Sequence, residues 1–208
     1  MRTLTKELRD KLTPKEAIEV LKAGNERFVN NLKAHRNLLQ QVNETSDGQF
    51  PFAAILSCMD SRTSVELIFD QGLGDIFSIR IAGNILNDDI LGSLEFATKI
   101  AGSKVIVVLG HTKCGAITAA CNNVTLGSLT SLLQKIKPVI DEETETKNGR
   151  DGSNPAFVLN VTKLNVQLTM HDIKNKSIII SELISSGKID MVGGIYDVDN
   201  GRVVLFRN

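Results

Sequence analysis

Two short apolar runs, each followed by a cluster of reactive side chains, constrain the fold of this chain more than any other feature. Residues 52–57 lead into Cys58–Arg62, and residues 105–109 lead through a glycine into His111–Cys114. Short apolar runs bounded by polar segments predict buried strands. If the two strands are parallel members of one sheet, both clusters meet at its carboxyl edge, where open α/β sheets carry their sites.

Strand-like runs alternate with segments of helical periodicity along most of the chain. This alternation predicts an α/β fold, with a mostly parallel, helix-covered sheet, an antiparallel edge strand and an N-terminal helical arm. Parallel strands are expected at residues 52–57, 76–81, 105–109 and 191–196, and the antiparallel edge strand at 203–206 after the turn Asp199–Gly201. Helices are expected near residues 65–72, 90–101, 115–121, 129–140 and 178–186, and from Pro155 onward.

The whole chain, residues 1–208, is predicted to form a single domain, in which residues 1–48 are a helical arm and connector. The main helix of the arm should begin at Thr13, because threonine can cap it and Glu16 completes a capping box. Residues 35–49 are mostly polar and weakly periodic, which indicates a connector. The arm is too thin to form its own core, so it should pack on the main body or on a second subunit.

Composition excludes several kinds of partner. Acidic and basic residues balance at 24 each, whereas binding to nucleic-acid phosphates calls for a basic excess. No apolar stretch approaches the roughly 20 residues of a membrane span, and residues 1–7 lack the apolar core of a secretory signal. We therefore expect no nucleic acid, no membrane and a cytoplasmic location.

The two clusters supply ligand types that zinc prefers. Cys58, His111 and Cys114 offer two thiolates and one imidazole, and the latter two residues are close enough in sequence to reach one metal. Three cysteines cannot all pair, and without a visible signal segment they more often indicate metal binding or catalysis than disulfides. The alternative is that both cysteines are small buried hydrophobes and His111 only hydrogen-bonds near a strand end.

Asp60 and Arg62 lie directly after the first candidate ligand. Alternate residues of an extended loop point the same way, so these side chains can form a bidentate ion pair. Such a pair would keep Asp60 ionised and hold it away from the metal. The alternative is a solvated loop salt bridge, which contributes little.

Four other residues have less specific contexts. Arg80 nearly ends the second strand, at the same sheet edge, and is expected to contact either an anion or a structural partner. Cys121 lies among alanines on a predicted helix, which favours a core position. His35 and His171 lie in polar stretches and are expected at the surface.

Both clusters resemble the motifs of a known family. Cys58–Arg62 is similar to the Cys-x-Asp-Ser-Arg motif of β-class carbonic anhydrases, and Gly110–Ala116 is similar to their Gly-His-x-x-Cys-Gly motif. Gly24–Phe28 in the arm and residues 192–197 also resemble this family. The likeness covers nearly the whole chain.

The resemblance implies a zinc ion (Zn2+) held by Cys58, His111 and Cys114, with Asp60 and Arg62 as the catalytic pair. The implied reaction is the reversible hydration of carbon dioxide to bicarbonate and a proton. Family members differ in whether the counterpart of Asp60 also ligates zinc, so Asp60 is a possible fourth ligand in a closed state.

The resemblance also implies substrate contacts and an assembly. Gln49 matches, by its distance before the first motif, a family glutamine that contacts the substrate, and Gly115 matches a glycine whose N–H faces the site. Arg80 joins them as a candidate contact for the small-molecule substrate, carbon dioxide or bicarbonate. The family further implies a homodimer or higher homo-oligomer in which the arm wraps a neighbour.

Three other functions fit some of these residues. A hydrolase of carbon disulfide or carbonyl sulfide would keep the same fold and metal. A non-catalytic structural zinc protein would use Asp60 as a permanent fourth ligand, because structural zinc sites are closed and catalytic ones keep an open position. A redox module is the weakest alternative, since Cys58 and Cys114 do not form a Cys-x-x-Cys pair.

Overall fold

A five-stranded sheet lies at the centre of the computed structural model, which describes residues 3–207. The strand order is β2-β1-β3-β4-β5, with the first four strands parallel and β5 antiparallel to β4. This arrangement confirms the predicted fold class. The strands are β1 (Ala53–Ser57), β2 (Ile76–Arg80), β3 (Val105–His111), β4 (Asp190–Tyr196) and β5 (Val203–Phe206).

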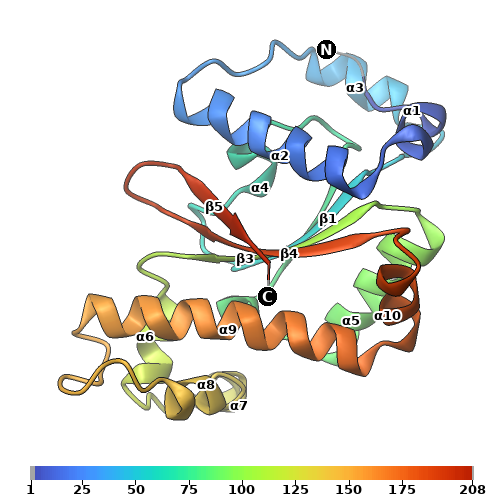
Figure 1. Ribbon diagram of the computed structural model, residues 1–208. Helices are drawn as coiled ribbons and strands as arrows, with labels where there is room; N and C mark the ends of the chain where they lie inside the picture. Colours follow the sequence, from blue (N-terminus) through green and yellow to red (C-terminus); the bar gives the residue numbers. More distant parts are fainter. Residues whose placement is uncertain (1–2, 208) are drawn as a thin grey trace.

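Helices cover both faces of the sheet (Figure 1). One face carries α1 (Lys6–Lys11), α2 (Pro14–Val29), α3 (Leu38–Glu44) and α4 (Val65–Ile68). On the opposite side lie α5 (Asp88–Glu95), the π-helical turn η2 (Phe96–Ile100), α6 (Gly115–Cys121), α7 (Gly127–Gln134), α8 (Lys137–Glu142), α9 (Pro155–Lys176) and α10 (Ile178–Ser185). A short 3-10 turn, η1 (Ala82–Asn84), follows β2.

The two faces of the sheet have separate apolar cores. Ile55 of β1 belongs to the cluster that contains Leu21 of α2, whereas its neighbour Leu56 belongs to the cluster that contains Met170 of α9. Every residue of β1 is buried, which explains why this strand is continuously apolar rather than alternating.

The helical arm takes part in this packing. Thr13 Oγ1 accepts a hydrogen bond from the Glu16 N–H at 3.2 Å, and the Glu16 carboxylate accepts one from the Thr13 N–H at 2.8 Å, so the predicted capping box is confirmed. Ile18 and Leu21 then bury one side of α2 in the same cluster as β1. The helix therefore packs on the main body of its own chain, which is the first of the two expected positions.

The prediction of a single helix over residues 129–140 is wrong. The chain forms α7 and α8 there, separated by a short break, and Pro138 lies in the first turn of α8. Proline has no N–H to donate to the preceding turn, so it starts a new helix more readily than it continues an old one.

The segment over residues 35–49, predicted as a connector, contains the helix α3, which the sequence pattern does not predict. Asn37 caps the helix, and its side chain accepts a hydrogen bond from the Gln40 N–H at 3.1 Å. Gln41 is buried, and its side chain accepts a hydrogen bond from the Leu73 N–H at 3.2 Å. Contacts with a distant segment therefore stabilise a helix whose own apolar periodicity is weak.

Candidate active site

Three metal-type ligands converge at the carboxyl edge of the sheet. Cys58 directly follows β1, His111 is the last residue of β3, and Cys114 is the N-cap residue of α6. β1 and β3 are parallel neighbours, so their carboxyl ends lie side by side. The ligand atoms lie within 4.8 Å of one another, and the three side chains are 4%, 0% and 1% exposed.

His111 was expected on a loop, but β3 extends to include it, and it pairs with Tyr196 of β4. Its Nδ1 lies 2.9 Å from the carbonyl oxygen of Thr112. Because a carbonyl only accepts hydrogen bonds, Nδ1 carries the proton and Nε2 of the neutral ring keeps its lone pair. Nε2 is buried without a hydrogen-bond partner among the described residues, which is the arrangement of a metal ligand.

The sulfur atoms fit zinc in distance as well as in chemistry. Cys58 Sγ and Cys114 Sγ lie 3.8 Å apart. Two thiolates at the usual Zn–S distance of about 2.3 Å, subtending a tetrahedral angle, would lie about 3.8 Å apart. Together with the unpartnered His111 Nε2, this spacing matches the donor set that zinc prefers.

The two thiols influence each other's ionisation. The hydrogen bond with Cys114, with smaller contributions from His111 and from backbone N–H groups, outweighs burial and lowers the pKa of Cys58 to about 4. The same hydrogen bond, burial and the nearby Cys58 charge raise the pKa of Cys114. These opposite shifts favour one thiolate and one thiol in the pair, and a bound cation favours release of the second proton.

Asp60 and Arg62 form the predicted bidentate pair. Arg62 Nε donates to Asp60 Oδ1 at 2.9 Å, and Nη2 donates to Oδ2 at 2.7 Å. The hydrogen bond from the Arg62 side chain holds the pKa of Asp60 well below its usual range, despite partial burial. Asp60 Oδ2 lies 4.0 Å from His111 Nε2, so an ionised carboxylate stands beside the three ligands.

The backbone of the first motif is held by two further side chains. Thr63 Oγ1 lies 2.8 Å from the carbonyl oxygens of both Cys58 and Asp60. Arg80 donates to the same two carbonyls, from Nε to Cys58 at 3.2 Å and from Nη2 to Asp60 at 2.5 Å. These contacts make Arg80 a structural partner of the motif, the second of its two expected roles, and Thr63 is a site residue that sequence reasoning missed.

Gln49 is not brought to the site of its own chain. It is exposed and precedes the amino end of β1, whereas Cys58 follows the carboxyl end of that strand. Gly115 does lie at the site, because it opens α6 immediately after Cys114, and a Cβ there would meet nothing within 4 Å.

The remaining predictions of burial are confirmed. Cys121 is buried in the apolar cluster of α6 and α9, and all three cysteines are free thiols. His35 and His171 are exposed.

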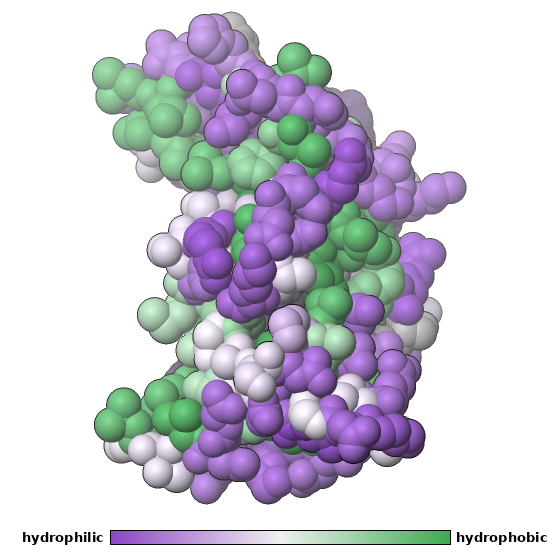
Figure 2. Space-filling model, turned by 90° about the vertical axis from the view of Figure 1, so that its left-hand side faces the viewer, coloured by the Kyte–Doolittle hydropathy of each residue, from purple (hydrophilic) through white to green (hydrophobic). Residues whose placement is uncertain are grey.

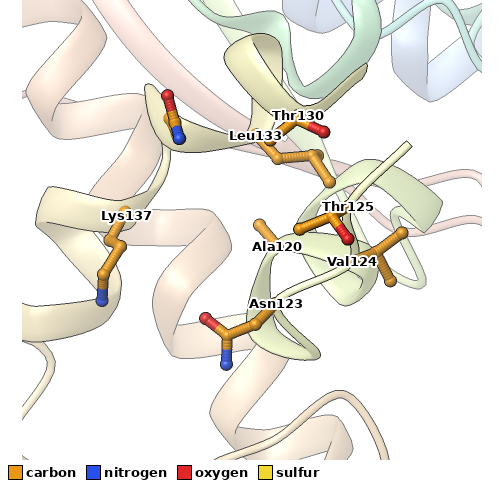
Figure 3. A pocket seen from close by; sticks show the side chains of 8 residues that line it. Ala120, Asn123, Val124, Thr125, Thr130, Leu133 and Lys137 are labelled. Carbon is orange, nitrogen blue, oxygen red and sulfur yellow. The ribbon is translucent and has the colours of Figure 1, made fainter. Parts of the chain in front are cut away.

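Two further views show one face of the molecule and a separate cavity. Figure 2 looks at the side of the molecule where β3 leads into α6 and the β4–β5 hairpin turns, and hydrophilic residues gather over the middle of that face. Figure 3 shows a separate cavity of about 150 Å³ between α6 and α7. Ala120, Asn123 and Leu133 are among its lining residues, and none of the three candidate ligands lines it.

No helix within residues 3–207 is both long enough and apolar enough to cross a membrane.

Comparisons with known proteins agree with this geometry. Residues 53–203 match the family model described as carbonic anhydrase. Carbonic anhydrase 2 of Mycobacterium tuberculosis is 38% identical over 200 residues, and the carbonic anhydrase of Mycolicibacterium smegmatis is 32% identical over 198 residues. The first alignment covers 92% of each chain, and the second covers 92% of this chain and 93% of the relative.

Solved structures share the fold. The β-carbonic anhydrase CafA of Aspergillus fumigatus superposes with a TM-score of 0.71 at 25% identity, covering 81% of each chain. A tetrameric β-carbonic anhydrase of Sordaria macrospora superposes with a TM-score of 0.71 at 22% identity, covering 93% of this chain and 98% of that one.

Proposed function

The chain belongs to the β-class carbonic anhydrase family, and from this premise we propose that it catalyses the reversible hydration of carbon dioxide to bicarbonate with one zinc ion. Cys58, His111 and Cys114 would hold the metal. The observation that carries this proposal is the convergence of their ligand atoms, with a sulfur–sulfur distance of 3.8 Å, beside an ionised carboxylate.

Zinc in this ligand set supplies the Lewis acidity that makes water a nucleophile at moderate pH. The protein's own contribution is a hydrogen-bond acceptor held in a fixed position. Asp60 is ionised and Arg62 fixes its position, so its carboxylate can accept a hydrogen bond from the attacking water and orient the oxygen toward the carbon of carbon dioxide. A C–O bond forms, one C=O bond of carbon dioxide becomes a single bond, and the water proton leaves to solvent.

Arg62 has a second role in this proposal. The guanidinium of Arg62 donates to both carboxylate oxygens of Asp60. Its Nη2 also donates to the carbonyl oxygen of Lys113 at 3.2 Å, which connects the first motif to the second. This pairing supports a site in which Asp60 is held back from the metal and the fourth position is open to water and substrate. A closed site, with Asp60 as the fourth ligand, requires Arg62 to release the carboxylate.

Two alternatives share this site. A structural zinc protein would need a fourth protein ligand, but the described residues bring only three such side chains together, and Asp60 is paired elsewhere. A hydrolase of carbon disulfide or carbonyl sulfide would use the same metal and differ in substrate.

We also propose a homodimer or higher homo-oligomer in the cytoplasm, organised as one domain over residues 1–208. Gln49 supports the assembly indirectly: because it lies at the opposite end of β1 from Cys58, it could contact substrate only in the site of another subunit. The arm, although packed on its own sheet, exposes Leu38, Leu39 and Val42 of α3.

The test is stopped-flow measurement of carbon dioxide hydration together with zinc analysis of the same sample. We expect about one zinc per chain and rapid hydration that increases toward alkaline pH. Parallel assays with carbon disulfide and carbonyl sulfide separate the hydrolase alternative. Stoichiometric zinc without turnover of any of the three substrates would refute the catalytic proposal and favour a structural metal.

A further inference from the structure

The sulfur of Cys58 has a hydrogen-bond donor that lies outside both motifs. The N–H of Gly83, in η1, donates to Cys58 Sγ at 3.4 Å. A hydrogen bond to a ligand sulfur draws charge from it and so changes how strongly the thiolate binds a metal. The position of the Gly83 peptide is therefore relevant to the metal site.

The turn that presents this N–H does not have a relaxed backbone. Gly83 and Asn84 are successive left-handed residues, with φ of 67° and 43°. Left-handed backbone is accessible to glycine but strained for residues that carry a Cβ. A Cβ at position 83 would also lie 3.0 Å from Ile136 Cδ1, so only glycine fits there without strain.

One face of α9 holds the turn in place. Asn165 Nδ2 donates to the carbonyl oxygen of Gly83 at 2.8 Å, and Thr169 Oγ1 donates to that of Asn84 at 3.4 Å. The two residues are four apart and so lie on the same side of the helix, which runs along the sheet in Figure 1. Asn165 is buried to 1% exposure, so its bond to Gly83 is made away from competing water.

The same helix also packs against the second motif. A Cβ at Gly110, the residue before His111, would lie 2.9 Å from Val166 Cγ2 and 3.0 Å from Thr162 Cγ2. α9 thus lies in contact with the strand that delivers His111 while it holds the turn that reaches Cys58.

From these contacts we propose that Asn165 is a positioning residue, which aims the Gly83 N–H at the Cys58 sulfur and so sets the donor strength of this ligand. This inference rests on the zinc site proposed above. The amide side chain is required because it donates to the Gly83 carbonyl, which an apolar residue of the same size cannot do.

The test compares Asn165→Leu with Thr162→Val in the full chain loaded with Co2+ in place of Zn2+. Leucine has the same number and branching of side-chain heavy atoms as asparagine but cannot donate a hydrogen bond. Thr162→Val is a matched control, because Thr162 is equally buried on the same helix and its hydroxyl donates, among residues 3–207, to the Val158 carbonyl within α9, at 2.7 Å. The readouts are the sulfur-to-cobalt charge-transfer band and the retention of zinc against a chelator.

In Asn165→Leu we expect the charge-transfer band to move to longer wavelength, because a thiolate that has lost a donor gives up charge more easily. We also expect zinc affinity to fall about tenfold, because Cys58 loses the hydrogen bond that orients it toward the metal. Thr162→Val should change neither. Should Asn165→Leu not fold, Asn165→Ala removes the same donor and is measured in the same way.

Two results would overturn the inference, and they are distinguishable. If the Asn165 variants lose thermal stability but keep the band and zinc affinity of Thr162→Val, then Asn165 only stabilises the fold and the zinc site stands. If the wild-type chain binds neither Zn2+ nor Co2+, the proposed zinc site is refuted, and so is the role proposed for Asn165.

Discussion

Arg62→Ala is the most direct test of how the site works. The substitution removes both side-chain bonds to Asp60, at 2.9 and 2.7 Å, and the bond to the Lys113 carbonyl at 3.2 Å. Arg62 is about half exposed, with 48% of its side chain accessible, so the loss of folding free energy should be only about 1 kcal/mol. The effect on activity should be much larger than the effect on stability.

The expected loss of hydration activity is about 100-fold, which is the loss that a misplaced group in the active site can cause. This corresponds to about 2.7 kcal/mol in the activation barrier. Arg62 lowers the pKa of Asp60, so its removal raises that pKa toward the ordinary value near 3.8. Asp60 therefore remains ionised between pH 7 and 9, and the loss must come from its position. The released carboxylate, close to the three ligands, becomes available as a fourth ligand.

The assay is a pH–rate profile from stopped-flow hydration, with zinc content measured on the same protein. Arg207→Ala is the matched control, because it removes an exposed arginine that pairs with Asp190 at 2.7 Å, at the opposite edge of the sheet. Zinc should stay stoichiometric in both variants. Turnover of Arg62→Ala close to that of the wild type across the alkaline range would show that the pair is only a loop salt bridge.

Three further predictions follow from other parts of the molecule. Cys114→Ser should lose most of its zinc in metal analysis, and full retention would remove Cys114 from the ligand set. Burial raises the pKa of Asp70, but hydrogen bonds from Arg27, Arg36 and the Ala34 N–H outweigh it, so the net pKa is lowered. Its stabilisation is therefore present above about pH 4 and lost as pH falls through the lowered pKa. Asp70→Asn should lower the free energy of unfolding by about 3 kcal/mol near neutral pH and the Tm by roughly 10 °C. It should also weaken the loss of stability on acidification, and a pH dependence equal to that of the wild type would contradict this. Sedimentation at micromolar concentration should show a dimer or a multiple of it, and a clean monomer would contradict the proposed assembly.

Local signals in the sequence were enough for most of the secondary structure. The helix over residues 115–121 and the start of α9 at Pro155 agree with the structure, because small apolar residues and a proline at the first turn act locally. The helix break near Pro138 was missed although its signal is local. The helix at α3 was missed for a different reason, because its anchor is the contact between Gln41 and Leu73.

The candidate ligands could likewise be chosen from sequence, since Cys58, His111 and Cys114 each follow a strand-like run and have the right chemistry. Sequence could not show that their ligand atoms meet within 4.8 Å, because this depends on β1 and β3 being neighbours in the sheet order. Gln49 was chosen by its sequence distance from the first motif. In the structure it precedes the amino end of β1, whereas Cys58 follows the carboxyl end.

Sequence by itself determined the alternation of elements, the burial of β1 and the types of side chain at the site, because these depend on residues close together in the chain. Only the tertiary structure decided that Arg80 holds the backbone of the first motif and that Asn165 holds the turn next to Cys58. Asn165 and Gly83 are 82 positions apart. No local pattern relates two such residues, and their hydrogen bond exists because α9 packs across the sheet and brings the buried amide to the turn.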